Sequence, residues 1–313
     1  MIRHSIPSKV KTALSNPNEL AGWVRRKVQA VDRKGGCKIY RNAATFRANL
    51  AGQIALKKVK EKSNPQLSTE GRPDVSEFKH LGIPYEEKTL NKVKTQYNEV
   101  IEDENHSSTL EYDGNIYSYR LDSPNFDFAK HMPAFADLVN DEVIKTVQDS
   151  YGSYFKPVRV TAYRNFHIPQ EIREESDIYS NRYHTDAHTI DHLKLFVYLD
   201  DTSEVDGPFH LIPAQESSEI VKMSSFKHKG NIDVVEEKVT PIKFTGPTGS
   251  TALVNVSLQE HRAGVPEPGH SRDIIQFVFA PASEPLPDDW PEHKEMWTHP
   301  GRDHNGLSRL LRY

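Results

Sequence analysis

Tyr183-His184-Thr185-Asp186 is followed by two apolar segments, Leu-Lys-Leu-Phe-Val-Tyr-Leu-Asp-Asp at residues 193–201 and Asp-Gly-Pro-Phe-His-Leu-Ile-Pro at residues 206–213. On a β-strand, residues i and i+2 point to the same face. We therefore expect His184 and Asp186 to present an imidazole and a carboxylate side by side. The β-branched and aromatic residues that follow, with a Gly-Pro turn between them, predict short consecutive strands behind this pair.

Segments of the same kind continue through the C-terminal half of the chain. They are rich in Val, Ile, Thr and aromatic residues, and turns containing Gly or Pro separate them. Many short strands with such turns are typical of a β-sandwich or barrel, including the double-sheet jelly rolls. The expected strands are residues 158–166, 193–199, 209–212, 232–235, 241–244, 251–256 and 274–279.

The N-terminal half carries helical patterns instead. Residues 18–34, 42–60, 86–103 and 133–149 have apolar side chains at three- and four-residue spacing and are the expected helices. The predicted fold class is therefore α+β with a mainly β core.

Basic residues are concentrated near the N-terminus. Residues 1–63 hold 15 Lys and Arg but only three acidic residues, although the whole chain has a net charge of −4. Such a segment either folds onto the acidic remainder of its own chain or docks on an acidic partner. No nucleic-acid-binding motif is recognisable, so no nucleic-acid partner is expected. We expect a basic helical extension over residues 1–63, a linker near residues 63–74, and a second domain over residues 64–313.

The composition limits the class of protein. Of 313 residues, 36% are hydrophobic and 27% are charged, which is ordinary for a globular chain. No apolar run approaches the roughly 18 residues of a transmembrane helix. Cys37 is the single cysteine, which excludes an internal disulfide framework and Cys-based zinc sites. No secretory signal is recognisable, and a cytoplasmic location is expected.

A distant histidine and arginine complete the pattern around His184 and Asp186. His261 follows the expected strand at 251–256, and Arg272 begins the strand at 274–279 after a Pro- and Gly-rich loop. Two imidazoles and one carboxylate on one face of a metal ion are the ligand set of non-haem Fe(II) oxygenases. An arginine beside them can bind a carboxylate through a planar two-point fork.

Together these segments resemble the phytanoyl-CoA dioxygenase superfamily of Fe(II)/2-oxoglutarate oxygenases. The resemblance covers about residues 155–282. It implies a double-stranded β-helix, which is a cupin-like jelly roll, with the N-terminal helices packed outside. It also implies that His184, Asp186 and His261 are the iron ligands, and that Arg272 anchors the distal carboxylate of 2-oxoglutarate. His270 competes with His261, but only His261 leaves the family's step of 11 residues to Arg272.

The chain departs from the family's pattern at two places. Relatives often place a hydroxyl two residues after the distal histidine, where this chain has Ala263, and the usual Gly-Ser-His is replaced by Ala-Gln-Glu at residues 214–216. Lys194 is our candidate for the missing cosubstrate contact. A lysine that only lays its aliphatic stem along the strand explains the residue nearly as well.

Several neighbouring side chains are candidates for the pocket. His188 and His192 follow the motif closely, and we expect them to support the site or line the substrate pocket. Tyr163 and Asn165 share one face of the preceding strand, where a structural role is equally plausible. The polar segment at residues 168–182 is long for a strand connection and is expected to act as a lid.

The resemblance implies a dioxygenase that uses Fe(II), 2-oxoglutarate and O2, releases succinate and CO2, and hydroxylates a C–H bond of a small or medium organic substrate. The carboxylate of Asp186 favours hydroxylation, because related halogenases have a small apolar residue there. Two other functions stay open. A cupin-like Zn or Mn enzyme would leave Arg272 without a purpose, and a binding protein would use only the basic arm. The basic segment weakly favours an anionic or carrier-linked substrate, and the oligomeric state is not predicted.

Overall fold

The computed structural model describes residues 78–123, 125–152, 154–186, 192–222, 232–256, 258–282 and 284–293. The predicted extension at 1–63, with its two helices, and the predicted linker lie outside these ranges, so the domain boundary stays a prediction. No helix in the described ranges is long and apolar enough to cross a membrane.

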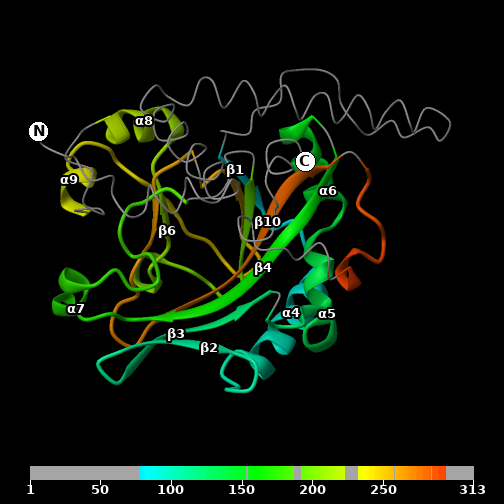
Figure 1. Cartoon of the computed structure of the whole chain (residues 1–313), viewed down its shortest axis with the longest axis horizontal. Helices are drawn as coiled ribbons and strands as arrows, with labels where there is room; N and C mark the ends of the chain where they lie inside the picture. Colours follow the sequence, from blue (N-terminus) through cyan, green and yellow to red (C-terminus); the bar gives the residue numbers. More distant parts are fainter. Residues whose placement is uncertain are drawn as a thin grey trace, which may run out of the picture.

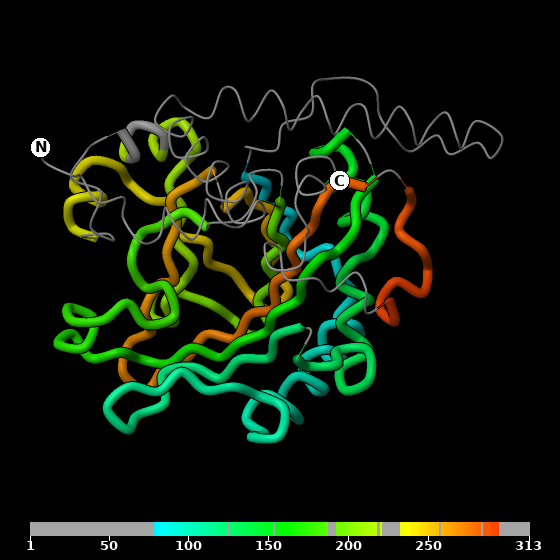
Figure 2. Tube along the Cα trace, viewed as in Figure 1, coloured from blue at the N-terminus to red at the C-terminus, as the bar shows by residue number. Residues whose placement is uncertain are grey.

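A seven-stranded antiparallel sheet forms the backbone of the fold. Its two longest strands, β4 and β10, run side by side at its centre (Figures 1 and 2). In spatial order the strands are β1 (Lys79–Gly82), β8 (Thr251–Val254), β5 (Leu193–Tyr198), β10 (Ser271–Ala282), β4 (Tyr154–Phe166), β3 (Asn115–Asp122) and β2 (Ser108–Tyr112).

A second, three-stranded sheet faces the first. It consists of β7 (Ile242–Phe244), β6 (Phe209–Leu211) and β9 (His261–Ala263). His184 extends this sheet beyond β9, because its backbone exchanges two hydrogen bonds with that of His261, of 3.0 and 2.9 Å. After β4 the chain passes between the two sheets repeatedly before returning to β10. This is the order of a double-stranded β-helix, and it confirms the predicted jelly roll.

The alternation of side chains on β5 shows how the sequence builds two cores. Leu193, Leu195 and Val197 join the core under the helices, whereas Phe196 and Tyr198 join the core between the sheets. Every residue of this strand is buried, and all of them except Lys194 are apolar. The predicted strands at 158–166, 193–199, 209–212, 241–244, 251–256 and 274–279 are confirmed with boundaries shifted by a few residues.

Helices cover the outer face of the large sheet. In Figure 1, α4 (Glu87–Val100), α5 (Phe128–His131) and α6 (Asp141–Tyr151) lie on the side of β4 and β10 away from β6. The predicted helix at 86–103 is confirmed as α4. The one predicted at 133–149 is divided into a 3-10 helix (Pro133–Leu138) and α6. Asn140 marks the break, since its side chain accepts a hydrogen bond from Val143 N and caps α6.

The prediction of a strand at 232–235 is wrong. These residues form the short helix α9 (Ile232–Glu236), in which Val235 is buried against Tyr183, Ile212 and Ile220. The β propensity of Ile and Val is overridden by this packing. Strands β1, β2, β3 and β9 were not predicted, and α7 (Gln170–Glu175) and α8 (Ala214–Lys222) lie in segments read as loops.

Candidate metal centre

Backbone hydrogen bonds hold the His-x-Asp segment against its distant partners. His184 is paired with His261 on β9, and Asp186 N donates to Val256 O at 3.0 Å. The segment therefore lies as an extra strand at the edge of the small sheet. In this extended backbone, His184 and Asp186 present their side chains to the same face, as the spacing predicts.

The three predicted metal ligands converge. His184 Nε2 lies 3.4 Å from Asp186 Oδ1, and His261 Nε2 lies 3.7 Å from the same oxygen. One ligand atom from each residue lies within 4.8 Å of the other two. Among the described residues, this is the only group of three or more His, Cys, Asp or Glu side chains that could hold a metal ion.

Backbone carbonyls determine which ring nitrogen of each histidine is available. His184 Nδ1 lies 2.9 Å from Arg182 O, and His261 Nδ1 lies 3.1 Å from Gln259 O. A carbonyl oxygen only accepts, so each Nδ1 carries the proton and donates it. Both Nε2 atoms then face Asp186, which is the orientation in which they could bind a metal ion held by that carboxylate.

Burial and charge shift the pKa values of the two histidines in opposite directions. Burial, with a smaller contribution from the neighbouring His184, lowers the pKa of His261 to about 3. Burial also acts to lower the pKa of His184, but the hydrogen bond and charge of Asp186 outweigh it, and the net shift is upward. His261 is thus neutral at physiological pH and ready to act as a ligand. A cation at the site would take the place of the proton that Asp186 favours on His184.

Lys194 lies at the metal centre and not beside Arg272. Its Nζ is 2.6 Å from Asp186 Oδ2, and the residue is buried. Lys194 pairs in register with Val278, six residues along β10 from Arg272. At about 3.4 Å per residue, the two cations are attached about 20 Å apart on the sheet. The role of Lys194 as a cosubstrate contact stays a prediction.

Arg272 is fully enclosed without a carboxylate partner in the described part of the chain. It is 2% exposed, and its Nη1 donates to the carbonyl oxygens of Gly207 and Gly264. Its Nε is buried with no hydrogen-bond partner. A buried guanidinium is costly unless an anion pairs with it. The arrangement therefore favours the binding of an anion at this end of the site.

Two glycines bring the carbonyl groups to Arg272. Gly207 has φ +67°, and a Cβ there would lie 2.5 Å from Pro266 N. A Cβ on Gly264 would lie 2.3 Å from Pro208 O. Only glycine allows the two backbones to approach this closely. The Asp-Gly-Pro turn that helped to predict the fold thus also fixes the carbonyl oxygen that Arg272 contacts.

One cavity of about 220 Å³ connects the metal ligands with Arg272. Ala263 lies in its wall, two residues after His261 and one before Gly264. Tyr163 and Asn165, for which a pocket role and a structural role were equally plausible, also line it, and Asn165 accepts a 2.7 Å hydrogen bond from Ser118. The expected lid contributes Tyr179 and Ser180, and its remaining described residues include α7.

Other candidate residues lie elsewhere. His192 is buried but does not line the cavity, and His188 falls outside the described residues. His270 is paired with Asp206 and is not brought to the metal ligands. The sequence reading missed Arg120 and Arg159, which also line the cavity. Little in the sequence indicated that they line a cavity. Arg120 lies on β3, which was not predicted, and charged residues on strands usually face solvent.

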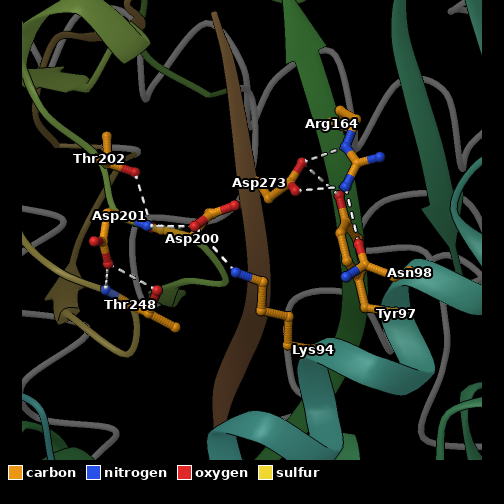
Figure 3. A network of polar contacts seen from close by, with 9 residues as sticks. All are labelled: Lys94, Tyr97, Asn98, Arg164, Asp200, Asp201, Thr202, Thr248 and Asp273. Atoms are coloured by element: carbon orange, nitrogen blue, oxygen red, sulfur yellow. Dashed lines mark hydrogen bonds and ion pairs between the residues drawn. The ribbon is translucent and has the colours of Figure 1, made fainter.

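A polar network fixes the start of β10 from the outer face of the sheet (Figure 3). Arg164 donates to both oxygens of Asp273, at 2.8 and 2.7 Å, and the hydroxyl of Tyr97 donates to the same carboxylate at 3.0 Å. From the same helix α4, Lys94 pairs with Asp200 at 3.0 Å. Because Asp273 follows Arg272 directly, this network also holds the backbone from which Arg272 enters the cavity.

The fold is shared with several solved enzymes at low sequence identity. SnoN, an alpha ketoglutarate dependent epimerase from nogalamycin biosynthesis, solved in complex with Fe3+ and alpha ketoglutarate, has a TM-score of 0.52 and 12% identity, over 75% of this chain and 90% of that chain. HygX from Streptomyces hygroscopicus, solved with nickel and 2-oxoglutarate, has a TM-score of 0.50 and 14% identity, over 75% and 95%. The carbocyclase SnoK from nogalamycin biosynthesis has a TM-score of 0.50 and 11% identity, over 79% and 95%.

No known family profile matches the sequence, and no curated protein matches it. What the comparisons show is that the chain shares its fold with SnoN, HygX and SnoK.

Proposed function

We propose that this chain is an Fe(II)- and 2-oxoglutarate-dependent dioxygenase that hydroxylates a C–H bond of a small or medium organic substrate, with release of succinate and CO2. The observation that carries the proposal is the joint exposure of the His184–Asp186–His261 group and the buried Arg272 to one cavity. SnoN and HygX, which share the fold, are described with iron or nickel and with the 2-oxo acid bound.

The residues fit both proposed ligands. Two imidazole nitrogens with free lone pairs and one carboxylate form the donor set that suits Fe(II) and leaves further coordination positions open. The unpaired Nε of Arg272 fits a carboxylate that arrives with the cosubstrate. Once bound, the iron and the cosubstrate supply the activation of O2 and the oxidation of the C–H bond.

The protein supplies geometry, charge and exclusion of water. His184, Asp186 and His261 would hold the iron from one side, while the carbonyls of Gly207 and Gly264 keep Arg272 in place for the distal carboxylate. Phe196, Phe209 and Ile274 are buried in the cavity wall and make it apolar near the metal ligands. Such a wall strengthens the ion pairs inside it and protects the reaction from water.

The finer assignments belong to the same proposal. Membership in the phytanoyl-CoA dioxygenase superfamily rests on the sequence pattern, and the choice of hydroxylation rests on the carboxylate at position 186. Fold neighbours that are named as an epimerase and a carbocyclase make this choice one to be tested. A cytoplasmic location would supply the Fe(II) and 2-oxoglutarate. A non-oxygenase metalloenzyme would leave the buried Arg272 without a partner.

Succinate formation with Fe(II), ascorbate and 2-oxoglutarate tests the function. We expect slow turnover even without substrate, and more than about 100-fold less in Asp186→Ala and His261→Ala, with loss of metal binding. His270→Ala is the matched control, because this exposed histidine is the alternative distal ligand and should keep full turnover. If Asp186→Ala retained both bound iron and decarboxylation, the ligand assignment would be wrong.

A further inference from the structure

Two arginines line the cavity at a distance from Arg272. Arg120 lies on β3 and Arg159 on the neighbouring β4, and both meet at the carboxylate of Asp122. Arg159 Nε donates to Asp122 Oδ1 at 2.7 Å, and its Nη2 contacts Oδ2. Arg120 Nη2 lies 3.4 Å from that same Oδ2. Among the described residues, one carboxylate thus serves two guanidinium groups at this corner of the cavity.

The two arginines differ in how firmly they are held. Arg159 is fixed by the fork on Asp122, which is itself held by a 3.1 Å hydrogen bond from Thr161. Within the described ranges, the Arg120 guanidinium is held by the long contact alone, and its Nε is buried with no hydrogen-bond partner. The pair therefore combines an oriented guanidinium with one that still has donors to satisfy.

Arg159 is attached far along the sheet from Arg272, whereas Arg120 pairs with Tyr163, two residues from Asn165, and turns its guanidinium toward Asp122. Asn165 on β4 pairs with Arg272 on β10, and Arg159 lies six residues before Asn165. At about 3.4 Å per residue, this separates the two attachment points by about 20 Å. The two guanidinium groups meet at Asp122, which pairs with Thr161, four residues along β4 from Asn165 and so about 14 Å from the level of Arg272.

The charge of the cavity points to a second anion. Among the described residues that line it, Asp186 is the only acid, whereas Arg120, Arg159, Lys194 and Arg272 are cations. The two charges of 2-oxoglutarate would be matched by the iron and Arg272. Asp186 is already paired with Lys194. In the part of the chain that the structure describes, Asp122 is the carboxylate that contacts Arg120 and Arg159, and the Nε of Arg120 is buried without a hydrogen-bond partner.

We propose that Arg120 and Arg159 bind a carboxylate or phosphate group of the substrate. The inference rests on the proposed function in one respect, which is that the substrate is the molecule oxidised at the metal centre. Planar guanidinium forks match the oxygens of both groups. The substrate is then a small anionic molecule whose reactive carbon lies at the metal centre while its charged group is held at the β3–β4 side of the cavity.

Anion binding to the loaded protein tests the proposal. Inorganic phosphate and propionate are the probes, added to protein that holds Mn(II) and 2-oxoglutarate, so that the metal and Arg272 are already occupied. Calorimetry gives the affinity, and Mn(II)-induced relaxation of the 31P or 13C nucleus reports whether the probe lies in the same cavity. We expect one or both probes to bind, and Arg120→Gln and Arg159→Gln to weaken binding by about tenfold or more.

Lys156→Gln is the matched control. Lys156 lies on the same strand as Arg159, is exposed and does not line the cavity, so it removes an equal charge elsewhere. The Arg120→Gln variant is expected to fold normally, because the Arg120 side chain is 36% exposed. Binding of phosphate alone would identify a phosphate-bearing substrate, and binding of propionate alone a carboxylate-bearing one.

The outcomes separate this inference from the proposed function. If 2-oxoglutarate binds the wild type and both arginine variants, but the variants bind anions as well as Lys156→Gln does, the anion site is refuted and the oxygenase proposal stands. If 2-oxoglutarate does not bind the Mn(II)-loaded wild type at all, the oxygenase proposal itself fails.

Discussion

Lys194 Nζ lies 2.6 Å from Asp186 Oδ2, so an ammonium group is paired with the carboxylate of the proposed iron site. Both residues are largely enclosed, with side chains 10% and 17% exposed, which strengthens the attraction between them. A divalent cation bound to Asp186 would be placed close to this ammonium group. Lys194 is therefore expected to oppose the binding of a metal ion to Asp186.

Replacement of Lys194 by Met tests whether its charge opposes metal binding. The change keeps the aliphatic stem and removes the charge, so we expect Co(II) to bind the apo-protein about tenfold more tightly than it binds the wild type. Isothermal titration calorimetry measures the affinity. Lys243→Met removes the same charge from an exposed pair with Glu204 and should leave the affinity unchanged. Weaker Co(II) binding in Lys194→Met would mean that Lys194 instead orients Asp186 for the metal.

Ala263→Ser restores the hydroxyl that relatives of the proposed family often carry. Ala263 lines the cavity between His261 and the carbonyl of Gly264 that Arg272 contacts. A donor there can reach a cosubstrate that spans the same gap, so we expect the Kd of 2-oxoglutarate to fall by about threefold to tenfold. Calorimetry with the Ni(II)-loaded protein measures it. Ala263→Val adds bulk without a donor, and an equal gain in that variant would contradict the hydrogen-bond explanation.

The β core could be predicted from the sequence because its strands are buried. β5 is apolar at every position except Lys194, and the Gly-Pro turn before β6 is required by a close approach of two backbones. The strands that were missed lack this signal. β2 is almost entirely exposed, and β9 is only three residues long. Such strands depend on pairing with distant partners, which a single sequence does not display.

The candidate metal ligands could be predicted because their spacing in the sequence is characteristic. His184 and Asp186 are two positions apart in the sequence, and His261 and Arg272 follow at a spacing that the family resemblance supplies. Arg120 and Arg159 have no such spacing. They meet only because β3 and β4 pair, with Asp122 opposite Thr161. The contact of Lys194 with Asp186 was also missed, since it depends on how the two sheets face each other.

The outer network at Asp273 should contribute to stability. Burial raises the pKa of Tyr97, and the charge of Asp273 raises it further, so the hydroxyl stays protonated and donates to that carboxylate. Tyr97→Phe leaves a buried charge with one hydrogen bond fewer, and we expect a loss of about 1–3 kcal/mol in the free energy of unfolding. Urea unfolding measures it.

Tyr85→Phe is the matched control for that change. The hydroxyl of Tyr85 donates to a neutral acceptor, the carbonyl of Leu138, at 3.2 Å. Its loss should therefore cost less, at about 0.5–1.5 kcal/mol. Equal losses in the two variants would show that the charge of Asp273 adds nothing to the hydrogen bond from Tyr97.

His210 should make the protein sensitive to acid. Burial, with smaller contributions from the charges of Arg262 and Lys243, lowers the pKa of His210 to about 3. Its Nδ1 lies 3.6 Å from Glu236 Oε1, which would favour a charged imidazole. However, the same oxygen is 3.0 Å from Arg262 and accepts from Tyr183, so its charge is already paired. The neutral imidazole is therefore the state of the folded protein.

The pKa of His210 differs between the folded and the unfolded state, and this difference decides how stability changes with pH. In the unfolded chain His210 takes up a proton below a pKa of about 6.5, whereas the folded protein resists protonation down to about pH 3. The unfolded state binds more protons in this window, so stability is complete above pH 6.5 and is lost as the pH falls. At pH 5 the loss from this residue is about 2 kcal/mol relative to pH 7.5.

His210→Gln tests that account, because glutamine does not titrate. Urea unfolding of both proteins at pH 7.5 and pH 5 gives two differences, in which the contributions of all other histidines are shared. We expect the wild type to lose about 2 kcal/mol more than the variant between the two values. A charged His210 paired with Glu236 in the folded state would have the opposite sign, since the variant would then be the more acid-sensitive protein. The measurement therefore decides whether the small sheet beside the metal centre holds His210 as a neutral group or as half of an ion pair.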